Sequence, residues 1–70
     1  MFSVGDMVVA KETIYDIIED EIYKVIDIEY SNLGSEFLTV KDNYGVRYDG
    51  IYSYRFEIYK TKKNNNAINY

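Results

Sequence analysis

An alternation of apolar and polar residues on both sides of a turn sequence constrains the fold of this chain most strongly. Within residues 36–41, the run Leu-Thr-Val-Lys has the period of two that is typical of a half-buried strand. Residues 42–45, Asp-Asn-Tyr-Gly, favour a tight turn because Asn and Gly tolerate a positive φ angle. The alternation resumes in residues 46–49. We therefore predict an antiparallel hairpin beside which the other segments lie as strands.

Three more segments are predicted as strands from their alternation and their β-branched or aromatic residues. They are residues 7–11, 21–30 and 55–59. In the longest segment the apolar phase changes near Val25 and Ile26, which indicates a β-bulge and a bend. The side chains expected to point inward from the first and last strands are Val8, Ala10, Phe56 and Ile58.

The connections differ in length and character. Residues 12–20 carry apolar side chains at helical spacing, but the segment is short and β-branched, so we prefer a long loop with Ile17 or Ile18 tucked under the sheet. Residues 50–54 suit a single 3₁₀ turn. Residues 60–70 lack apolar periodicity, and we expect a disordered polar tail.

Length and composition place the chain among small single domains. The 70 residues contain no Cys and no His, so neither a disulfide nor an imidazole ligand supports the fold. A core of this size supplies only about 3–5 kcal/mol of net stability. Nine Tyr and three Phe side chains can add core volume and can also serve an interface. We therefore expect one domain over residues 1–59.

The first residues show neither the basic segment nor the apolar segment of a signal peptide, and no apolar run is long enough for a membrane span. We expect a cytoplasmic protein without a membrane partner. Charge is unevenly distributed along the chain. Residues 1–40 hold nine acidic and two basic side chains, whereas residues 41–70 hold three acidic and six basic ones.

Four short motifs occur in a fixed order along the chain. They are Val-Gly-Asp at residues 4–6, Tyr-x-Val at 23–25, Leu-x-Val-x-Asp-x-x-Gly at 38–45 and Tyr-Arg-Phe-Glu at 54–57. This order resembles the SH3-like barrel, and more narrowly the small SH3-like proteins of bacteriophages. The resemblance implies an all-β, five-stranded SH3-like antiparallel barrel with one short 3₁₀ turn before the last strand. It also implies a phage origin and action inside an infected host cell.

Catalysis and metal binding find little support in the residue types. Nucleophilic catalysis usually needs a base beside the nucleophile, and with no His the Ser and Thr hydroxyls lack their common partner. The acidic patch, Asp16, Glu19, Asp20 and Glu21, lacks the spacing of a calcium-binding loop. We expect these carboxylates to keep the domain soluble, and we expect no enzyme activity, cofactor or metal.

Binding to another protein is the leading interpretation, because the aromatic residues exceed what a five-stranded core can bury. Tyr and Arg dominate interface hot spots. The candidate contact residues are Tyr15, Tyr30, Leu33, Tyr44, Tyr48, Tyr52, Tyr54 and Arg55. The chain has no Trp, which the proline-binding groove of SH3 domains requires by family resemblance. The resemblance implies that the partner is a host enzyme or defence protein, inhibited by occlusion. A homodimer through an edge strand or a tyrosine face is a further hypothesis.

Two alternatives involve nucleic acid. Aromatic and basic side chains that could stack on bases and contact phosphates are Tyr44, Arg47, Tyr48, Tyr52, Tyr54 and Arg55. The net charge of −4 opposes this alternative. Conversely, an acidic run could imitate a phosphate backbone and block a nucleic-acid-binding protein; it comprises Asp16, Glu19, Asp20, Glu21, Asp27 and Glu29.

Overall fold

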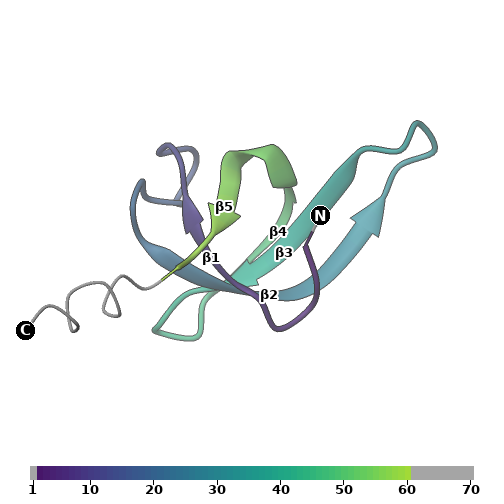
Figure 1. The fold of residues 1–70 in the computed structure, drawn as a ribbon. Helices are drawn as coiled ribbons and strands as arrows, with labels where there is room; N and C mark the ends of the chain where they lie inside the picture. Colours follow the sequence, from purple (N-terminus) through teal and green to yellow (C-terminus); the bar gives the residue numbers. More distant parts are fainter. Residues whose placement is uncertain (1, 61–70) are drawn as a thin grey trace, which may run out of the picture.

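The computed structural model describes residues 2–60, which form five β-strands and one 3₁₀ turn (Figure 1). The elements are β1 (Met7–Ala10), β2 (Ile22–Tyr30), β3 (Glu36–Lys41), β4 (Arg47–Tyr52), the 3₁₀ turn η1 (Ser53–Arg55) and β5 (Phe56–Ile58). All neighbouring strands are antiparallel, in the order β4-β3-β2-β1-β5. The prediction of an all-β fold with five antiparallel strands and a 3₁₀ turn before the last is confirmed.

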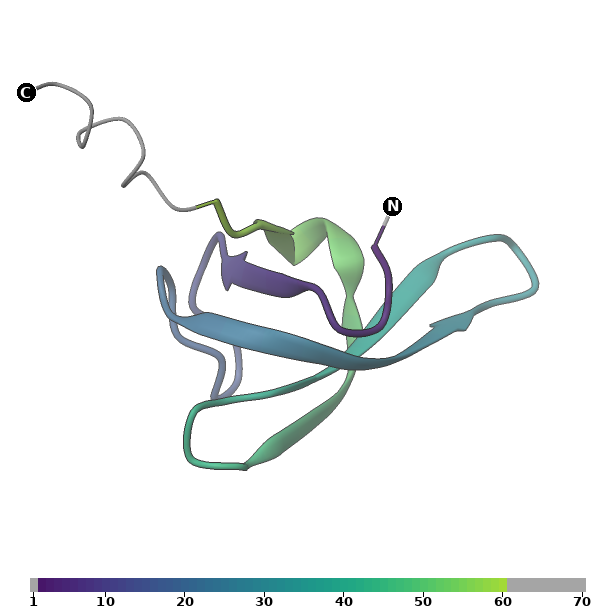
Figure 2. The same cartoon turned by 60° about the horizontal axis from the view of Figure 1, so that its bottom comes forward.

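The sheet is strongly bent but is not closed. In the part of the chain that the structure describes, β4 and β5 are the two edges of the sheet and do not pair with each other. The turn η1 separates them, and the three residues of β5 pair only with β1. Figure 2 shows β1 alongside β2, with the segment after η1 on the other side of β1. The closed barrel is therefore not confirmed.

Two β-bulges meet at Thr39 of β3 and bend the sheet there. In β2, Val25 pairs with Val40 and Asp27 pairs with Thr39, so Ile26 is the extra residue. In β4, Asp49 and Gly50 together face Thr39, and Gly50 has a φ of 65°, which glycine adopts without strain. The bulge predicted near Val25 and Ile26 is confirmed, whereas the bulge in β4 was not anticipated.

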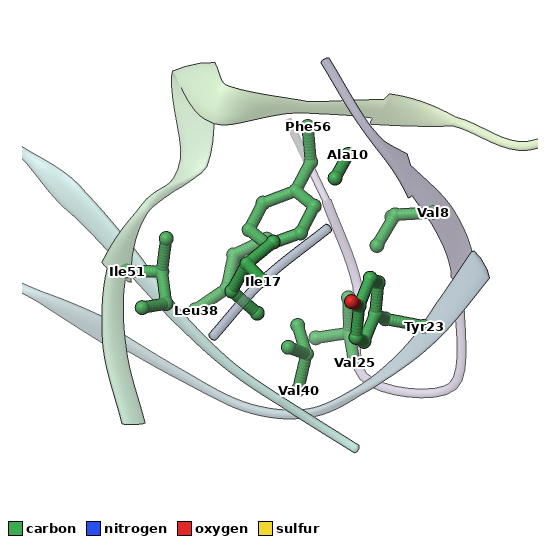
Figure 3. Close-up of a cluster of buried hydrophobic side chains, with 9 residues drawn as sticks. All are labelled: Val8, Ala10, Ile17, Tyr23, Val25, Leu38, Val40, Ile51 and Phe56. Atoms are coloured by element: carbon green, nitrogen blue, oxygen red, sulfur yellow. The ribbon is translucent and has the colours of Figure 1, made fainter. Parts of the chain in front are cut away.

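The core consists of apolar side chains from all five strands and from one loop (Figure 3). Its buried members are Val8, Ala10, Ile17, Tyr23, Val25, Leu38, Val40, Ile51 and Phe56. Ile17 comes from the segment between β1 and β2, where it forms an isolated bridge with Ile14. This segment is a loop, as predicted. Of the two candidates for burial, Ile17 is fully buried and Ile18 is 54% exposed.

Two predictions about the end of the domain need correction. Ile58 lies on the expected core side, in register with Val8, but it is 41% exposed at the end of the edge strand β5 and does not join the core. Residues 50–52 were assigned to a connector, but they belong to β4, and Ile51 joins the core. Apart from Lys60, the predicted tail of residues 60–70 lies outside the described residues. No helix between residues 2 and 60 has the length and apolar character needed to cross a membrane.

Candidate functional site

The strand register divides the side chains of β3 and β4 between two faces of the sheet. Leu38 and Val40 point into the core, so the alternating residues Phe37 and Lys41 lie on the opposite face, here called the outer face. Phe37 lies directly opposite Tyr52 of β4. The outer face therefore presents an aromatic pair next to the edge of the sheet.

Three rings on the outer face form a continuous stack, here called the aromatic stack: Phe37, Tyr52 and Tyr54. The Phe37 and Tyr52 rings are tilted by 37° to each other, with centroids 4.6 Å apart. The Tyr52 and Tyr54 rings are stacked, with centroids 5.1 Å apart and an interplanar angle of 24°. Tyr52 is 41% exposed and Tyr54 is 61% exposed. Each ring therefore packs against the next within the free chain.

Arg55 fixes the far end of the aromatic stack. Its guanidinium carbon lies 5.2 Å from the centroid of the Tyr54 ring, within the range of a cation–π contact. The same guanidinium forms an ion pair with Glu12, while the backbone N–H of Lys11 donates a 2.9 Å hydrogen bond to the carbonyl of Arg55. The loop after β1 and the turn η1 are thus held together, and Tyr54 is positioned between Tyr52 and a charged group.

A second feature is a small cavity between the β1–β2 loop and the β3–β4 turn. Its volume is about 110 Å³. The walls include three tyrosines and three carboxylates: Tyr23, Tyr44, Tyr48, Asp16, Glu21 and Asp42. The cavity is too small for a drug-sized ligand, for which pockets are typically about 300–1,000 Å³.

Asp42 organises the β3–β4 turn beside this cavity. Its carboxylate accepts hydrogen bonds from the backbone N–H groups of Tyr44 and Val46 at 2.8 and 2.9 Å and from the Tyr48 hydroxyl at 3.1 Å. Partial desolvation, the largest single influence, raises the pKa of this carboxyl, but the hydrogen bonds together bring it below its ordinary value. Desolvation and the neighbouring Asp42 raise the pKa of Tyr48.

The β2–β3 turn, residues 31–35, carries two of the candidate residues away from the others. The Ser31 hydroxyl accepts hydrogen bonds from the backbone N–H groups of Leu33 and Ser35, at 3.2 and 3.0 Å. Leu33 is 95% exposed, and the Tyr30 hydroxyl donates a 3.3 Å hydrogen bond to Glu36. The pKa of the Tyr30 hydroxyl is raised mainly by desolvation and, to a smaller extent, by the negative charge and hydrogen bond of Glu36. In Figures 1 and 2 this hairpin end extends away from the β3–β4 turn.

The structure therefore places the eight candidate contact residues in three groups and one isolated position. Tyr52, Tyr54 and Arg55 lie together, whereas Tyr44 and Tyr48 line the cavity. The remaining candidates are Tyr15, which is exposed in the β1–β2 loop, and Tyr30 and Leu33 at the β2–β3 hairpin end. Phe37 completes the stack but was absent from the candidates, because only the strand register reveals it.

The acidic patch is exposed on the β1–β2 loop. Its members Asp16, Glu19, Asp20 and Glu21 are all exposed, and the backbone N–H of Glu19 donates a 2.9 Å hydrogen bond to the Thr13 hydroxyl. Among the residues from 2 to 60, no group of three or more acidic side chains is arranged so that it could hold a metal ion.

No protein-family model, curated protein or solved structure matches this chain. A function for this chain therefore rests on the geometry of its own residues.

Proposed function

We propose that this chain is a non-enzymatic protein-binding module that contacts its partner through the aromatic stack and Arg55. The observation that carries the proposal is the exposed, preordered contact between Tyr52 and Tyr54. Tyr and Arg are enriched in interface hot spots, and rigid aromatic side chains lose little conformational entropy on binding. Because Phe37 and Arg55 brace the two tyrosines, less binding energy is lost in ordering them.

The SH3-like assignment is part of the same proposal. The strand order β4-β3-β2-β1-β5 and the 3₁₀ turn before β5 support it. From this assignment and from the sequence motifs that resemble small phage proteins, we infer a phage-encoded inhibitor. It would cover the working surface of a host enzyme or defence protein. Such inhibition needs no chemistry from the chain itself. A standard interface buries about 800 Å² on each partner, and this area is enough to cover a working surface.

A photo-crosslinking experiment tests the proposal. Benzoylphenylalanine is placed at Tyr54 in one variant and at Tyr15 in a matched control, since both side chains are highly exposed at 61% and 82%. Each variant is irradiated in a bacterial host lysate and the adducts are identified by mass spectrometry. We expect one protein to be crosslinked from position 54 and not from position 15. Equal adducts from both positions, or none from position 54, would contradict the proposal.

Single-stranded nucleic acid is the second candidate, favoured by the stacked rings beside Arg55. Exposed aromatic rings can stack on bases, and the guanidinium can contact a phosphate. The net charge of −4 opposes this function, because phosphate neutralisation supplies most of the non-specific affinity. A titration with labelled oligothymidine at low salt separates the two: salt-sensitive binding that Tyr54→Ala abolishes would favour nucleic acid.

A second copy of the chain is another protein partner to consider. In the described part of the chain both edge strands, β4 and β5, have one unpaired side, and β4 adjoins the aromatic stack. Size-exclusion chromatography with light scattering decides the matter. A species of twice the monomer mass that Tyr52→Ala dissociates would make the homodimer the functional form, and a monomer at high concentration would exclude it.

A further inference from the structure

Three cations lie directly opposite one another across three adjacent strands. Lys24 of β2 pairs with Lys41 of β3, and Lys41 pairs with Arg47 of β4. All three side chains are exposed and lie on the outer face. Together they are here called the cationic row. Residues in direct register have Cβ atoms about 4.5–5.5 Å apart, and like charges in such positions are destabilising. An arrangement that weakens the fold calls for a role outside folding.

Within residues 2–60 the cationic row is only partly neutralised. Arg47 forms an ion pair with Asp49, whose Oδ1 lies 3.2 Å from the Arg47 Nε, but both side chains remain well exposed. Lys24 and Lys41 form no ion pair in the described part of the chain. A local excess of positive charge thus persists on a protein whose net charge is −4.

Along β2, β3 and β4 the positive charge is confined to this single row. In the next row on the same face, Thr39 of β3 lies between Asp27 of β2 and Asp49 of β4. In the row after that, Glu29 of β2 lies opposite Phe37. Across β2, β3 and β4 the row spans two strand spacings, or about 10 Å. A long polyanion that continued along the strands would meet the carboxylates of Asp27 and Asp49. A short acidic segment that lies across the strands would not.

We propose that the cationic row receives an acidic segment of the protein partner; this inference rests on the proposed function and specifies the partner's chemistry. Alternate side chains of an extended segment are about 7 Å apart, so two such carboxylates fit within the length of the row. Phe37 and Lys41 lie four residues apart on the same face of β3, which corresponds to about 13 Å. One partner can therefore cover the aromatic stack and the cationic row together.

The test uses a labelled hexaglutamate peptide as the probe and fluorescence anisotropy as the readout. The variant combines Lys24→Gln with Lys41→Gln. The matched control combines Lys11→Gln with Lys60→Gln, two exposed lysines outside the row, so that the net charge changes equally. We expect the wild-type chain to bind hexaglutamate in a salt-sensitive manner. The row variant should bind roughly tenfold more weakly, and the control should stay close to wild type.

Three outcomes would overturn the inference. The first is an absence of hexaglutamate binding at low salt, and the second is an equal loss in the row variant and in the control. The third is tighter binding of an oligothymidine than of hexaglutamate, weakened by the row variant, which would assign the row to phosphate groups. The crosslink from position 54 distinguishes this inference from the proposed function. If the crosslink persists in the row variant while any of these three outcomes is observed, the proposed function stands and only this inference is rejected.

Discussion

The backbone N–H of Ile18 donates a 2.9 Å hydrogen bond to the hydroxyl oxygen of Tyr23, and this contact ties the β1–β2 loop to the core. Tyr23 is 3% exposed, and its ring packs edge-on against Tyr48 and Phe56, with centroids 6.0 and 6.2 Å away. One buried hydroxyl therefore positions the loop that also carries Glu12, the ion-pair partner of Arg55. The order of the loop and that of the aromatic stack are linked.

Removal of the Tyr23 hydroxyl should weaken the fold. In Tyr23→Phe the partly buried N–H of Ile18 loses its acceptor, and we expect a loss of about 1 kcal/mol in the free energy of unfolding. Urea unfolding followed by circular dichroism measures it. Tyr44→Phe is the control, because Tyr44 is 90% exposed and its change should be negligible. Equal stability of the Tyr23 variant and wild type would show that this hydrogen bond does not hold the loop.

Ile17 and Ile18 are chemically identical neighbours in opposite environments. Ile17 is fully buried whereas Ile18 is 54% exposed. We expect Ile17→Ala to cost about 2–4 kcal/mol, which approaches the whole stability of a domain of this size, and Ile18→Ala to cost well under about 1 kcal/mol. Thermal unfolding of the two variants makes the comparison. A larger loss from Ile18→Ala would mean that the loop packs in a different register.

Acid should remove the contribution of Asp42 to stability. The pKa of its carboxyl is lower in the folded state than its ordinary value of 3.8, so folding is favoured by the charged form above that value. The contribution is lost as the pH falls through the folded-state pKa. We expect Asp42→Asn to be less stable than wild type at neutral pH, and the difference to shrink below about pH 4. Urea midpoints across acidic pH measure it, and a difference that is independent of pH would contradict this account.

The cationic row should reduce the stability of the free protein. Lys24→Gln removes a like-charge contact with Lys41, and we expect a gain of about 0.2–1 kcal/mol at low salt that fades as salt is added. Urea unfolding at low and high salt checks it. The control is Lys11→Gln, which changes the net charge equally and should not reproduce the gain. A destabilised Lys24→Gln would mean that Lys24 supports the fold.

Local patterns in the sequence were sufficient to predict five strands and one bulge, but not the extension of β4 to Tyr52. The alternation in residues 36–41 and the phase change at Ile26 depend only on near neighbours in the chain, and the structure confirms both. The choice between Ile17 and Ile18 stayed open, because both residues suit burial and only the path of the loop decides between them.

The candidate site depended on register, which short-range patterns do not determine. The second bulge, at Asp49 and Gly50, shifts every later residue of β4 by one position relative to β3. Without this shift, the register of Val40 and Tyr48 would bring Glu36 opposite Tyr52 in place of Phe37. The aromatic stack therefore could not be predicted without the bulge. The cationic row likewise depends on the register of β2 against β3, which places Lys24 opposite Lys41.

Capture of a partner by variant proteins tests the central claim most directly. Three immobilised proteins are incubated with the same bacterial host lysate: the wild type, a stack variant that combines Tyr52→Ala with Tyr54→Ala, and a control that combines Tyr15→Ala with Tyr44→Ala. The retained proteins are quantified by mass spectrometry. Tyr15 and Tyr44 are 82% and 90% exposed and lie outside the stack. The account predicts one protein retained by wild type and by the control, and reduced roughly tenfold or more by the stack variant. Equal retention by the folded stack variant, or no protein retained by wild type, would contradict it.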